Sequence, residues 1–461
     1  LYASLPPEAQ MAAFQDKPDG CKRKVVLATN IAETSVTIPD IKFVVDTGKH
    51  KCRQVTTTGM ESLKIEDVSQ AQAAQRAGRA GRVAEGTCFR LYTEEAFRTL
   101  DPDSIPEILR VNLAQVILQL KGMGISDPTT FDFVTPPGKQ AIVRATKLLY
   151  GLKALDRNMD LSDHGKKLAK LPLDPVFGHL LLQSVEYECV KEMLTAVSVL
   201  SADNLFYRPN SSGNSSSGGA SQKAAAMHRR FASHEGDLPT FLNVYDAWRK
   251  EAVYVPPSSG GSKMQKKLIK QRQQQQQQAS QKHSSTILSH HDWCQQNFIS
   301  GRSMVRAHSI REQLQEICQR PPTETSQHNK NNKHSSGGGL GINVASSCGK
   351  DQEVFYRAVA AGLYLQVASR VKASSSAVDN GKGSGNVLNS KHMRGAYKTK
   401  LGNGTVSIHP SSALFGRNPA PACVVYTELV TTKKTYIRGV TQIREEWLHE
   451  VAPEFYHKAT T

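Results

Sequence analysis

The sequence predicts a multidomain protein in which an α/β domain is followed by two mainly helical domains and a small antiparallel β-barrel. Three observations support this. Short apolar strands alternate with helical segments in residues 1–97, apolar residues recur at helical spacing from about residue 106 to residue 255, and short strands separated by turn residues follow residue 354. At 461 residues the chain is also too long for a single hydrophobic core.

The first region has the pattern of an α/β domain with a largely parallel sheet. Apolar strands are predicted at Val25–Thr29, Ile41–Asp46 and Cys88–Tyr92, and a helix begins near Ala71. The first strand leads into a loop rich in Thr, Asn and Ser, residues 29–38. Such a loop places hydrogen-bond donors at the carboxyl edge of the sheet, where phosphates bind in α/β folds. An ordinary capping loop has the same composition, so this loop alone does not decide the function.

The strongest chemical signal is the segment QRAGRAGR, residues 75–82. Arg76, Arg79 and Arg82 recur every third residue between glycines and alanines, which permit close backbone approach. We expect their guanidinium groups near one face of a first helical turn. A guanidinium binds phosphate oxygens bidentately and stays protonated, so it can neutralise charge on a transferring γ-phosphoryl group. The alternative is an exposed basic helix cap or a patch for the RNA backbone.

The later regions read as a small helix–helix–hairpin unit, a set of amphipathic helices and a barrel of the OB type. Stretches of low complexity interrupt them. These stretches cannot bury enough apolar surface to offset chain entropy, so we expect disorder there. They are residues 210–221, 257–285, 322–350 and 373–395.

Composition narrows the class of partner. The chain has 58 Lys and Arg residues against 41 Asp and Glu residues, a net charge of +17, which favours nucleic acid or an acidic surface. A soluble protein with a few basic loops has the same balance. The eight cysteines form no C-x-x-C pair, so neither a metal site nor a disulfide framework is predicted, and we expect a reducing compartment. No apolar run approaches the roughly 20 residues of a membrane span.

Two motifs resemble those of the DEAH/RHA family of superfamily 2 ATP-dependent RNA helicases. TNIAETSVTI (residues 29–38) is similar to motif V, and QRAGRAGR is similar to motif VI. RLYTEEAF resembles the end of the second RecA-like lobe, PEILRVNLAQVILQLKGMGI the winged helix, LSADNLFYRP the ratchet domain, and IHPSSALF with ACVVYTELV, YIRGVTQI and WLHEVAPEFY the OB-fold.

The resemblance implies a definite order of domains. It predicts part of a second RecA-like lobe at 1–97, a winged helix at 98–170 and a helical-bundle (ratchet) domain at 171–320. The ratchet domain carries disordered insertions near 210–221 and 257–285. A disordered linker at 321–351 then leads to a small antiparallel β OB-fold domain at 352–461.

The resemblance also implies roles for the residues of motif VI. Gln75 helps to position the attacking water, and Arg79 and Arg82 contact the γ-phosphate of ATP as arginine fingers. Arg76 supports the motif by local pairing. Phe14 stacks on the adenine, although packing in the core is an equal alternative for this ring.

Motif V and two further segments are expected to contact RNA or the nucleotide. In motif V, Thr29 and Asn30 lie nearest the RNA and Thr37 lies toward the nucleotide. Relatives often have Asp two residues after that Thr, whereas Pro39 stands here. Residues 55–69 resemble the β-hairpin that wedges against RNA in the family, with Thr57 and Thr58 at its centre, and a plain surface hairpin is the alternative. Ser411 and Ser412 of HPSSAL are expected to contact RNA phosphates or simply to cap a turn.

The chain has no G-x-x-x-x-G-K-[ST] phosphate loop and no D-E-x-H or D-E-x-D sequence to hold magnesium. The chain also begins with Leu1 rather than Met. We therefore expect a fragment that does not hydrolyse ATP alone. ATP and Mg²⁺ are expected to be held mainly by a first lobe outside it, so that the parent protein is the enzyme.

For that parent protein the resemblance implies 3′-to-5′ movement on single-stranded RNA, in ribosomal RNA or pre-mRNA processing. HPSSALF with PACVVYTELV and VVDTG resembles nucleolar members more than members of the spliceosome core. We therefore expect the parent protein to be located in the nucleus, including the nucleolus, and a cytoplasmic location is the alternative. Expected partners are RNA and a G-patch activator, which in several relatives bridges winged helix and OB-fold. No membrane association is expected. Two alternatives are a catalytically inactive RNA-binding scaffold and a DNA-directed helicase.

Overall fold

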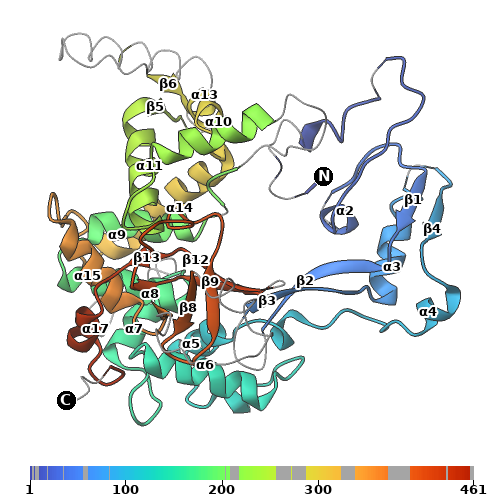
Figure 1. The fold of residues 1–461 in the computed structure, drawn as a ribbon. Coiled ribbons are helices and arrows are strands. Elements are labelled where there is room, and N and C mark those ends of the chain that lie inside the picture. The colour runs from blue at the N-terminus through green and yellow to red at the C-terminus, as the bar shows by residue number, and fades with distance from the viewer. Residues whose placement is uncertain are drawn as a thin grey trace, which may run out of the picture. The chain divides into compact units, whose positions relative to one another are not determined.

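The chain divides into two compact units, and each is described by itself (Figure 1). The first contains residues 1–113, 129–144 and 430–433, and the second contains residues 114–128, 145–429 and 434–461. The predicted winged-helix range, 98–170, is thus shared between the two units. The computed structural model describes residues 1–2, 5, 10–17, 19–34, 36–55, 61–82, 84–202, 204–207, 218–255, 271, 287–322, 338–371, 395–431 and 434–456.

The first unit holds a two-stranded parallel sheet of β1 (Phe43–Asp46) and β4 (Thr87–Arg90). This parallel pair confirms the α/β pattern predicted for residues 1–97. The predicted strand at Val25–Thr29 is wrong, because no strand is assigned to that described segment. Val25 and Leu27 are 80% and 83% exposed there, since no neighbouring strand of the described residues forms a ladder with them.

An antiparallel hairpin of β2 (Lys49–Val55) and β3 (Glu61–Asp67) follows β1. Its register runs from Lys49 opposite Asp67 to Val55 opposite Glu61. The hairpin predicted around residues 55–69 is therefore present, but its first strand begins six residues earlier than that range. The short helices of this unit are α2 (Ile31–Thr34), α3 (Gln70–Ala77), α4 (Glu94–Arg98) and the 3-10 turn η1 (Glu107–Leu109).

The helices that follow confirm the predicted order of a helix–helix–hairpin segment and a helical domain. Leu155 and Leu161 form the antiparallel bridge of the hairpin segment. The elements are α5 (Ala114–Gly122), η2 (Pro128–Thr130), α6 (Lys139–Gly151), α7 (Asp163–Ala169), α8 (Pro175–Glu186), α9 (Val190–Leu200), α10 (Gly218–Arg229), α11 (Asp237–Glu251), β5 (Ala252–Val253), β6 (Leu288–Ser289), α13 (His290–Gln296) and α14 (Gly301–Gln319).

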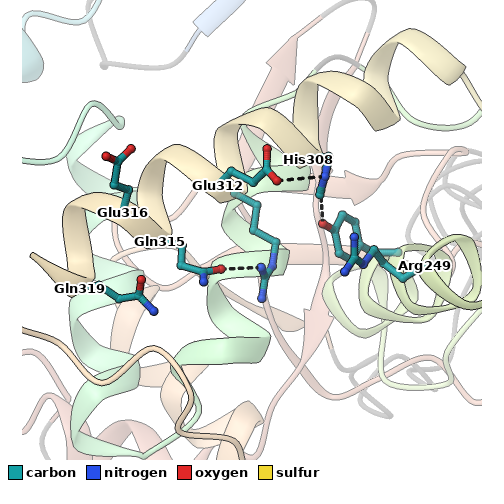
Figure 2. A pocket seen from close by; sticks show the side chains of 8 residues that line it. Arg249, His308, Glu312, Gln315, Glu316 and Gln319 are labelled. Carbon is teal, nitrogen blue, oxygen red and sulfur yellow. Dashed lines mark hydrogen bonds and ion pairs between the residues drawn. The ribbon is translucent and has the colours of Figure 1, made fainter. Parts of the chain in front are cut away.

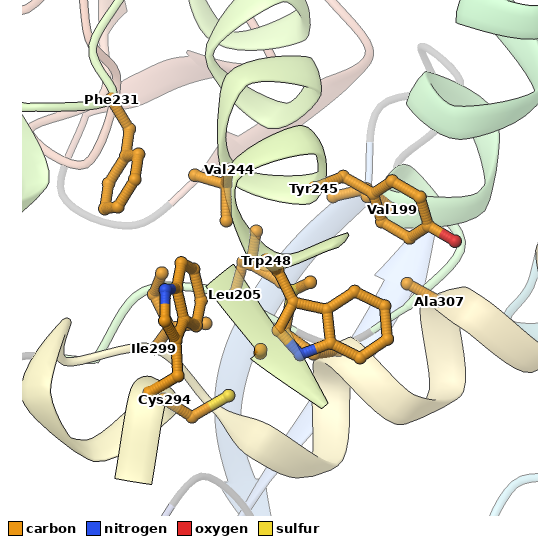
Figure 3. Close-up of a cluster of buried hydrophobic side chains, with 12 residues drawn as sticks. Val199, Leu205, Phe231, Val244, Tyr245, Trp248, Cys294, Ile299 and Ala307 are labelled. Atoms are coloured by element: carbon orange, nitrogen blue, oxygen red, sulfur yellow. The ribbon is translucent and has the colours of Figure 1, made fainter. Parts of the chain in front are cut away.

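Aromatic side chains from α11 and α13 organise the core of the helical domain (Figure 3). Trp248 and Trp293 are almost completely buried, and Phe231 packs against Trp293 with ring centroids 6.0 Å apart. The indole N–H groups also have partners, because Trp248 donates to His290 Nδ1 and Trp293 donates to Glu251 Oε2. Satisfying both donors lets these large rings be buried without the cost of an unpaired polar group.

The last domain is a sheet of short strands preceded by α15 (Gln352–Gly362) and followed by α17 (Glu446–Val451). The strand order is β13-β10-β7-β8-β9-β12-β11. The pairs are antiparallel as predicted between β7, β8 and β9, but β9 and β12 run parallel. The long connection between those two strands permits this arrangement, which a tight hairpin would exclude. The strands are β7 (Val367–Arg370), β8 (Ala396–Thr399), β9 (Thr405–Ile408), β10 (Cys423–Val425), β11 (Glu428–Thr431), β12 (Thr435–Arg438) and β13 (Thr441–Gln442).

Two of the segments predicted to be disordered differ from expectation where the structure describes them. Helix α10 begins at Gly218, inside the predicted insertion 210–221. In the predicted linker 321–351, the described part, 338–351, bonds to neighbouring helices: Ile342 N–H donates to Cys318 O and Lys191 N–H donates to Ser346 O. Val344 is buried. The mainly polar composition of this stretch led to the prediction of disorder and gave no weight to this buried apolar residue. Most of the other low-complexity residues lie outside the described part of the chain.

Candidate functional site

Motif V begins with two exposed residues and continues into a short helix, α2, that carries a buried carboxylate. Thr29 and Asn30 are exposed just before α2, and their carbonyl oxygens accept hydrogen bonds from Ala32 N–H and Glu33 N–H. Glu33, on α2, is buried instead. The predicted RNA-contacting residues are thus accessible, while the carboxylate next to them is turned into the protein.

Motif VI lies at the end of α3 rather than at its start. A capping box of Ser69 and Gln72 begins the helix, and Gly78 caps its carboxyl end. The prediction that the three arginines share a first helical turn is therefore wrong: Arg76 is in the last turn, and Arg79 and Arg82 follow the helix. The glycines of the motif end it, because glycine has a low helix propensity. Gln75 is exposed on the last turn.

Arg76 is the centre of a half-buried ion-pair network, as its predicted role in local pairing requires. Its Nε donates to Glu33 Oε2 at 2.9 Å, and its Nη1 donates to Asp46 Oδ1 at 2.8 Å. Tyr92 OH donates to Asp46 Oδ2 at 3.0 Å. Burial alone would raise the pKa of Asp46, but hydrogen bonds from Arg76, Gly48 N–H and Tyr92 together lower it. The network ties motif V, the end of β1 and motif VI together.

Asp46 and Tyr92 were not among the residues predicted for the site. Asp46 stands at the carboxyl end of β1 and Tyr92 two residues after β4. Because parallel strands end at the same edge of a sheet, the position of Asp46 in the run VVDTG was a usable signal. Nothing local to Tyr92 indicated its role.

The two predicted arginine fingers differ in their surroundings. Arg82 is exposed, and its Nη1 donates to the hydroxyl of Thr37, so the structure brings together two residues predicted to face the nucleotide. Arg79 is half-buried, and its Nε and Nη1 atoms are buried without a hydrogen-bond partner among the described residues. Burial, and then the nearby charge of Arg82, lower the pKa of Arg79. A guanidinium in this condition is a ready binding group for an anion.

The other residues predicted near the nucleotide or the hairpin are less informative. Phe14 is half-buried after a helical turn, and within the described residues no ring contact joins it to motif VI. Thr57 and Thr58 lie outside the described residues. Their predicted roles stay predictions.

Ser411 and Ser412 occupy different environments in the OB-like domain. Ser411 is exposed, and its hydroxyl lies 2.7 Å from His409 Nδ1. Ser412 is buried, and its hydroxyl donates to Asp237 Oδ1 at 3.0 Å. The hydroxyl of Ser412 therefore serves an internal contact in this structure, and of the pair only Ser411 presents its hydroxyl to solvent.

His409 connects Ser411 to an arginine that sequence reasoning missed. Arg438 Nη2 lies 3.2 Å from His409 Nε2, which must accept this hydrogen bond because a guanidinium only donates. The ring of Tyr436 meets His409 edge-on. Burial, and then the charge of Arg438, lower the pKa of His409, so its imidazole is held in the neutral form.

A separate pocket of about 350 Å³ lies between α11 and α14 (Figure 2). Five of its polar side chains are paired with one another. Tyr245 OH lies 2.8 Å from His308 Nδ1, Glu312 Oε1 lies 3.3 Å from His308 Nε2, and Arg311 donates to Gln315 Oε1. None of the described side chains that line the pocket has a buried nitrogen without a partner, in contrast to Arg79.

The described residues contain neither a metal-binding group nor a membrane-spanning helix. In that part of the chain no group of three or more His, Cys, Asp or Glu side chains could hold a metal ion. None of its helices combines the length and the apolar character needed to span a membrane.

Three domain families match successive parts of the chain. The helicase conserved C-terminal domain matches residues 1–84, the ratchet-like helicase associated domain (HA2) matches residues 174–241, and the oligonucleotide/oligosaccharide-binding (OB) fold matches residues 356–456. Arg76, its partners Glu33 and Asp46, and the two candidate fingers lie in the first of these regions, and Tyr92 lies just beyond it. The His409–Arg438 contact lies in the third.

Similar proteins cover the chain almost completely. The chain is 36% identical to the pre-mRNA-splicing factor ATP-dependent RNA helicase prp22 of Schizosaccharomyces pombe, over 99% of the chain and 32% of that protein. It is 35% identical to the ATP-dependent RNA helicase DHX33 of Homo sapiens, over 99% of the chain and 53% of that protein. It is also 35% identical to the pre-mRNA-splicing factor ATP-dependent RNA helicase DEAH10 of Arabidopsis thaliana, over 100% of the chain and 54% of that protein.

The chain spans between about a third and about half of the length of these relatives. Its domain content agrees with theirs: a helicase C-terminal lobe, a ratchet domain and an OB-fold occur in the predicted order. With motifs V and VI brought together by Arg76, the chain belongs to the DEAH-box family of RNA helicases, of which it covers the C-terminal part.

Proposed function

We propose that the protein containing this chain is an ATP-dependent RNA helicase or RNP-remodelling enzyme that moves 3′ to 5′ on single-stranded RNA. The observation that carries the proposal is the guanidinium of Arg79, two of whose nitrogens are buried without a partner among the described residues. An unpaired buried charge is costly, so a site of this kind is built for an anion that arrives from elsewhere.

The residues present fit the triphosphate of ATP. Arg79 and Arg82 would hold the γ-phosphate, with the Thr37 hydroxyl next to Arg82. Gln75, one turn before Arg79, would orient the attacking water. When bound, ATP supplies the phosphoanhydride bond whose hydrolysis drives movement. The two arginines stabilise the negative charge that develops on the transferring group. Mg²⁺ and the remaining phosphate contacts are assigned to a first lobe outside this chain.

The Arg76 network supports coupling between the nucleotide and RNA. Glu33 belongs to motif V and Arg76 to motif VI, and their side chains form an ion pair with a 2.9 Å Nε to Oε2 distance. Thr29 and Asn30 stand only a few residues before Glu33. A displacement of motif VI at the nucleotide would therefore shift the segment proposed to hold the RNA backbone.

Further RNA contacts are proposed at Thr57 and Thr58 of the hairpin and at Ser411. Adenine stacking by Phe14 and activation by a G-patch protein rest on the family resemblance alone. The names of prp22 and DEAH10 support pre-mRNA processing in the nucleus, while a nucleolar role in ribosomal RNA processing rests on sequence resemblance.

The test uses the whole protein with its first lobe. ATP hydrolysis is measured with and without single-stranded RNA for the wild type, Arg79→Gln, Arg82→Gln and Arg98→Gln. Arg98 is the matched control, because it lies in the same unit on α4 and forms an ion pair with Glu94 in which both side chains are exposed. Loss of an arginine finger should reduce turnover by about 10³-fold or more, and Arg98→Gln should leave it unchanged.

RNA affinity separates the two functions considered. If RNA stimulates hydrolysis, and the finger variants bind RNA but do not turn over ATP, the helicase assignment holds. If the wild type binds RNA but hydrolyses no ATP, the protein is an RNA-binding scaffold with a helicase fold.

A further inference from the structure

A single buried carboxylate joins the helical domain to the OB-like domain. Asp237, the first residue of α11, is 6% exposed. Its Oδ1 accepts from Ser412 Oγ at 3.0 Å and from Ala413 N–H at 2.7 Å, and its Oδ2 accepts from Val440 N–H at 2.7 Å. Both oxygens are therefore used, and the donors come from two separate loops of the OB-like domain.

The backbone around this carboxylate is equally constrained. Asp237 N–H donates to Val440 O at 2.7 Å, and Gln442 N–H donates to Glu235 O at 2.7 Å. Gly236 has a φ of +127°, and a Cβ placed there would lie 2.2 Å from Val440 O. Only glycine fits such a conformation and such a close approach. The start of α11 and the loop after β12 are thus held in one geometry.

The two loops that Asp237 binds carry a polar cluster in which Ser411 is exposed and His409 and Arg438 are half-buried. The first loop, after β9, contains His409 and Ser411, and the second follows Arg438 at the end of β12. His409 bridges the loops through its contacts with Ser411 and Arg438. The parallel pairing of β9 with β12 sets this spacing, since Ile408 is opposite Ile437.

The cluster has the chemistry of a phosphate site. Arg438 Nε is buried without a partner among the described residues, as is the case for Arg79. The Arg438 guanidinium and the Ser411 hydroxyl can both donate hydrogen bonds to one phosphodiester. Both ring nitrogens of His409 are already engaged with Ser411 and Arg438, so His409 orients these two donors rather than donating itself. The carboxylate Glu428 Oε2 lies 3.9 Å from Arg438 Nη1 and offsets part of this positive charge.

We propose that His409, Ser411 and Arg438 form an RNA phosphate-binding cluster and that Asp237 is the positioning residue that fixes it to helix α11. The proposal rests on the proposed RNA function and deepens it. Because one carboxylate binds both loops, a movement of α11 carries the whole cluster with it, and so moves the RNA backbone held there.

Asparagine at position 237 is the sharpest perturbation. Asn has one acceptor oxygen and an NH₂ group, so in either orientation its amide would face a donor, at Val440 N–H or at Ser412 and Ala413. Asp246→Asn is the matched control, since Asp246 is exposed on the same helix. Ser412→Ala removes a single donor and is the milder variant if Asp237→Asn does not fold.

The experiment measures the affinity of the whole protein for single-stranded oligo(U) by fluorescence anisotropy at several salt concentrations. Arg438→Gln should weaken binding about tenfold and reduce the salt slope by about one. Asp237→Asn should weaken binding by a similar factor, Ser412→Ala by about two- to threefold, and Asp246→Asn not at all. In steady-state hydrolysis, Asp237→Asn should raise the RNA concentration for half-maximal stimulation and leave the maximal rate unchanged.

A double-mutant cycle separates positioning from general stabilisation. If Asp237 acts through the cluster, the Asp237→Asn/Arg438→Gln protein should bind RNA no more weakly than Arg438→Gln alone. Additive losses would overturn the positioning role, and an Arg438→Gln protein with wild-type affinity would overturn the phosphate site. In both of those cases the wild type still binds RNA, whereas a wild type that binds no RNA refutes the proposed function itself.

Discussion

Replacement of Arg76 by Gln tests whether motifs V and VI are held together by a buried ion-pair network. The side chains of Arg76, Glu33 and Asp46 are 14%, 7% and 0% exposed. Removing the cation leaves two buried carboxylates uncompensated, a change that typically costs about 3–5 kcal/mol. We expect the lower end, about 3 kcal/mol, because Asp46 keeps hydrogen bonds from Gly48 N–H and Tyr92 OH.

The measurement is hydrogen exchange of amides in β1 and α3, which reports the free energy of opening of this unit rather than of the whole chain. Arg98→Gln is the control, because its ion pair with Glu94 is 74% and 81% exposed and should contribute only about 0.3–0.5 kcal/mol. Equal, small effects of the two substitutions would refute the network.

The pH dependence of this difference has a definite sign. The pKa of Asp46 is lowered in the folded protein, so its contribution is present above its ordinary pKa of about 4 and is lost as the pH falls below that value. The gap between wild type and Arg76→Gln should therefore shrink on acidification. A gap that is unchanged at pH 3 would mean that the carboxylates are not its cause.

Three further perturbations test the helical domain. Burial lowers the pKa of His179 to about 3, so its stabilising contribution should be complete above about pH 6.5 and decline as the pH falls from there toward about 3. Urea unfolding from pH 7 to 4.5 should show this decline, and His179→Phe should weaken the pH dependence. Gly362→Ala should cost about 1–3 kcal/mol in urea unfolding, since its Cβ would lie 2.7 Å from a backbone atom of the facing helix, whereas Gly219→Ala, in open space, should cost nothing. Trp248→Phe should lower the free energy of unfolding by about 1–2 kcal/mol, because it removes the indole N–H that donates to His290 Nδ1. An unchanged melting temperature would refute the stabilising role of this hydrogen bond.

The sequence was sufficient for the family and for the succession of helicase lobe, ratchet domain and OB-fold. Arg79 and Arg82 were singled out because the chemistry of phosphate transfer restricts residue type, and Thr37 because of the resemblance to motif V; their roles at a nucleotide site remain predictions. Where α3 begins and ends relative to the three arginines could not be predicted from their spacing. Gly78 ends the helix before the second arginine, so the fingers project from a turn.

Strand assignment failed where it depended on a neighbour. Val25–Thr29 has the composition of a strand, but a strand exists only through its ladder. Among the described residues Leu1 bonds to Leu27 O and Thr29 N–H of this segment, and no described strand continues that pairing. The parallel β9–β12 pair was missed for the related reason that strand order is a long-range property. Short strands joined by turns favour antiparallel pairing, yet β9 and β12 are joined by a connection long enough for the other direction.

Ser412 shows most clearly how a correct motif can conceal a residue's role. HPSSAL was expected to contact RNA through both serines, but Ser412 bonds to Asp237, which is 175 residues away from it in the chain. The carboxylate draws the second serine inward and leaves the first exposed beside His409. The serine proposed to contact RNA and the serine that contacts the helical domain are therefore adjacent residues of one loop. If the proposed cluster binds RNA, this adjacency would make the loop a mechanical link, because a displacement of α11 would reach Ser411 through Asp237 and Ser412.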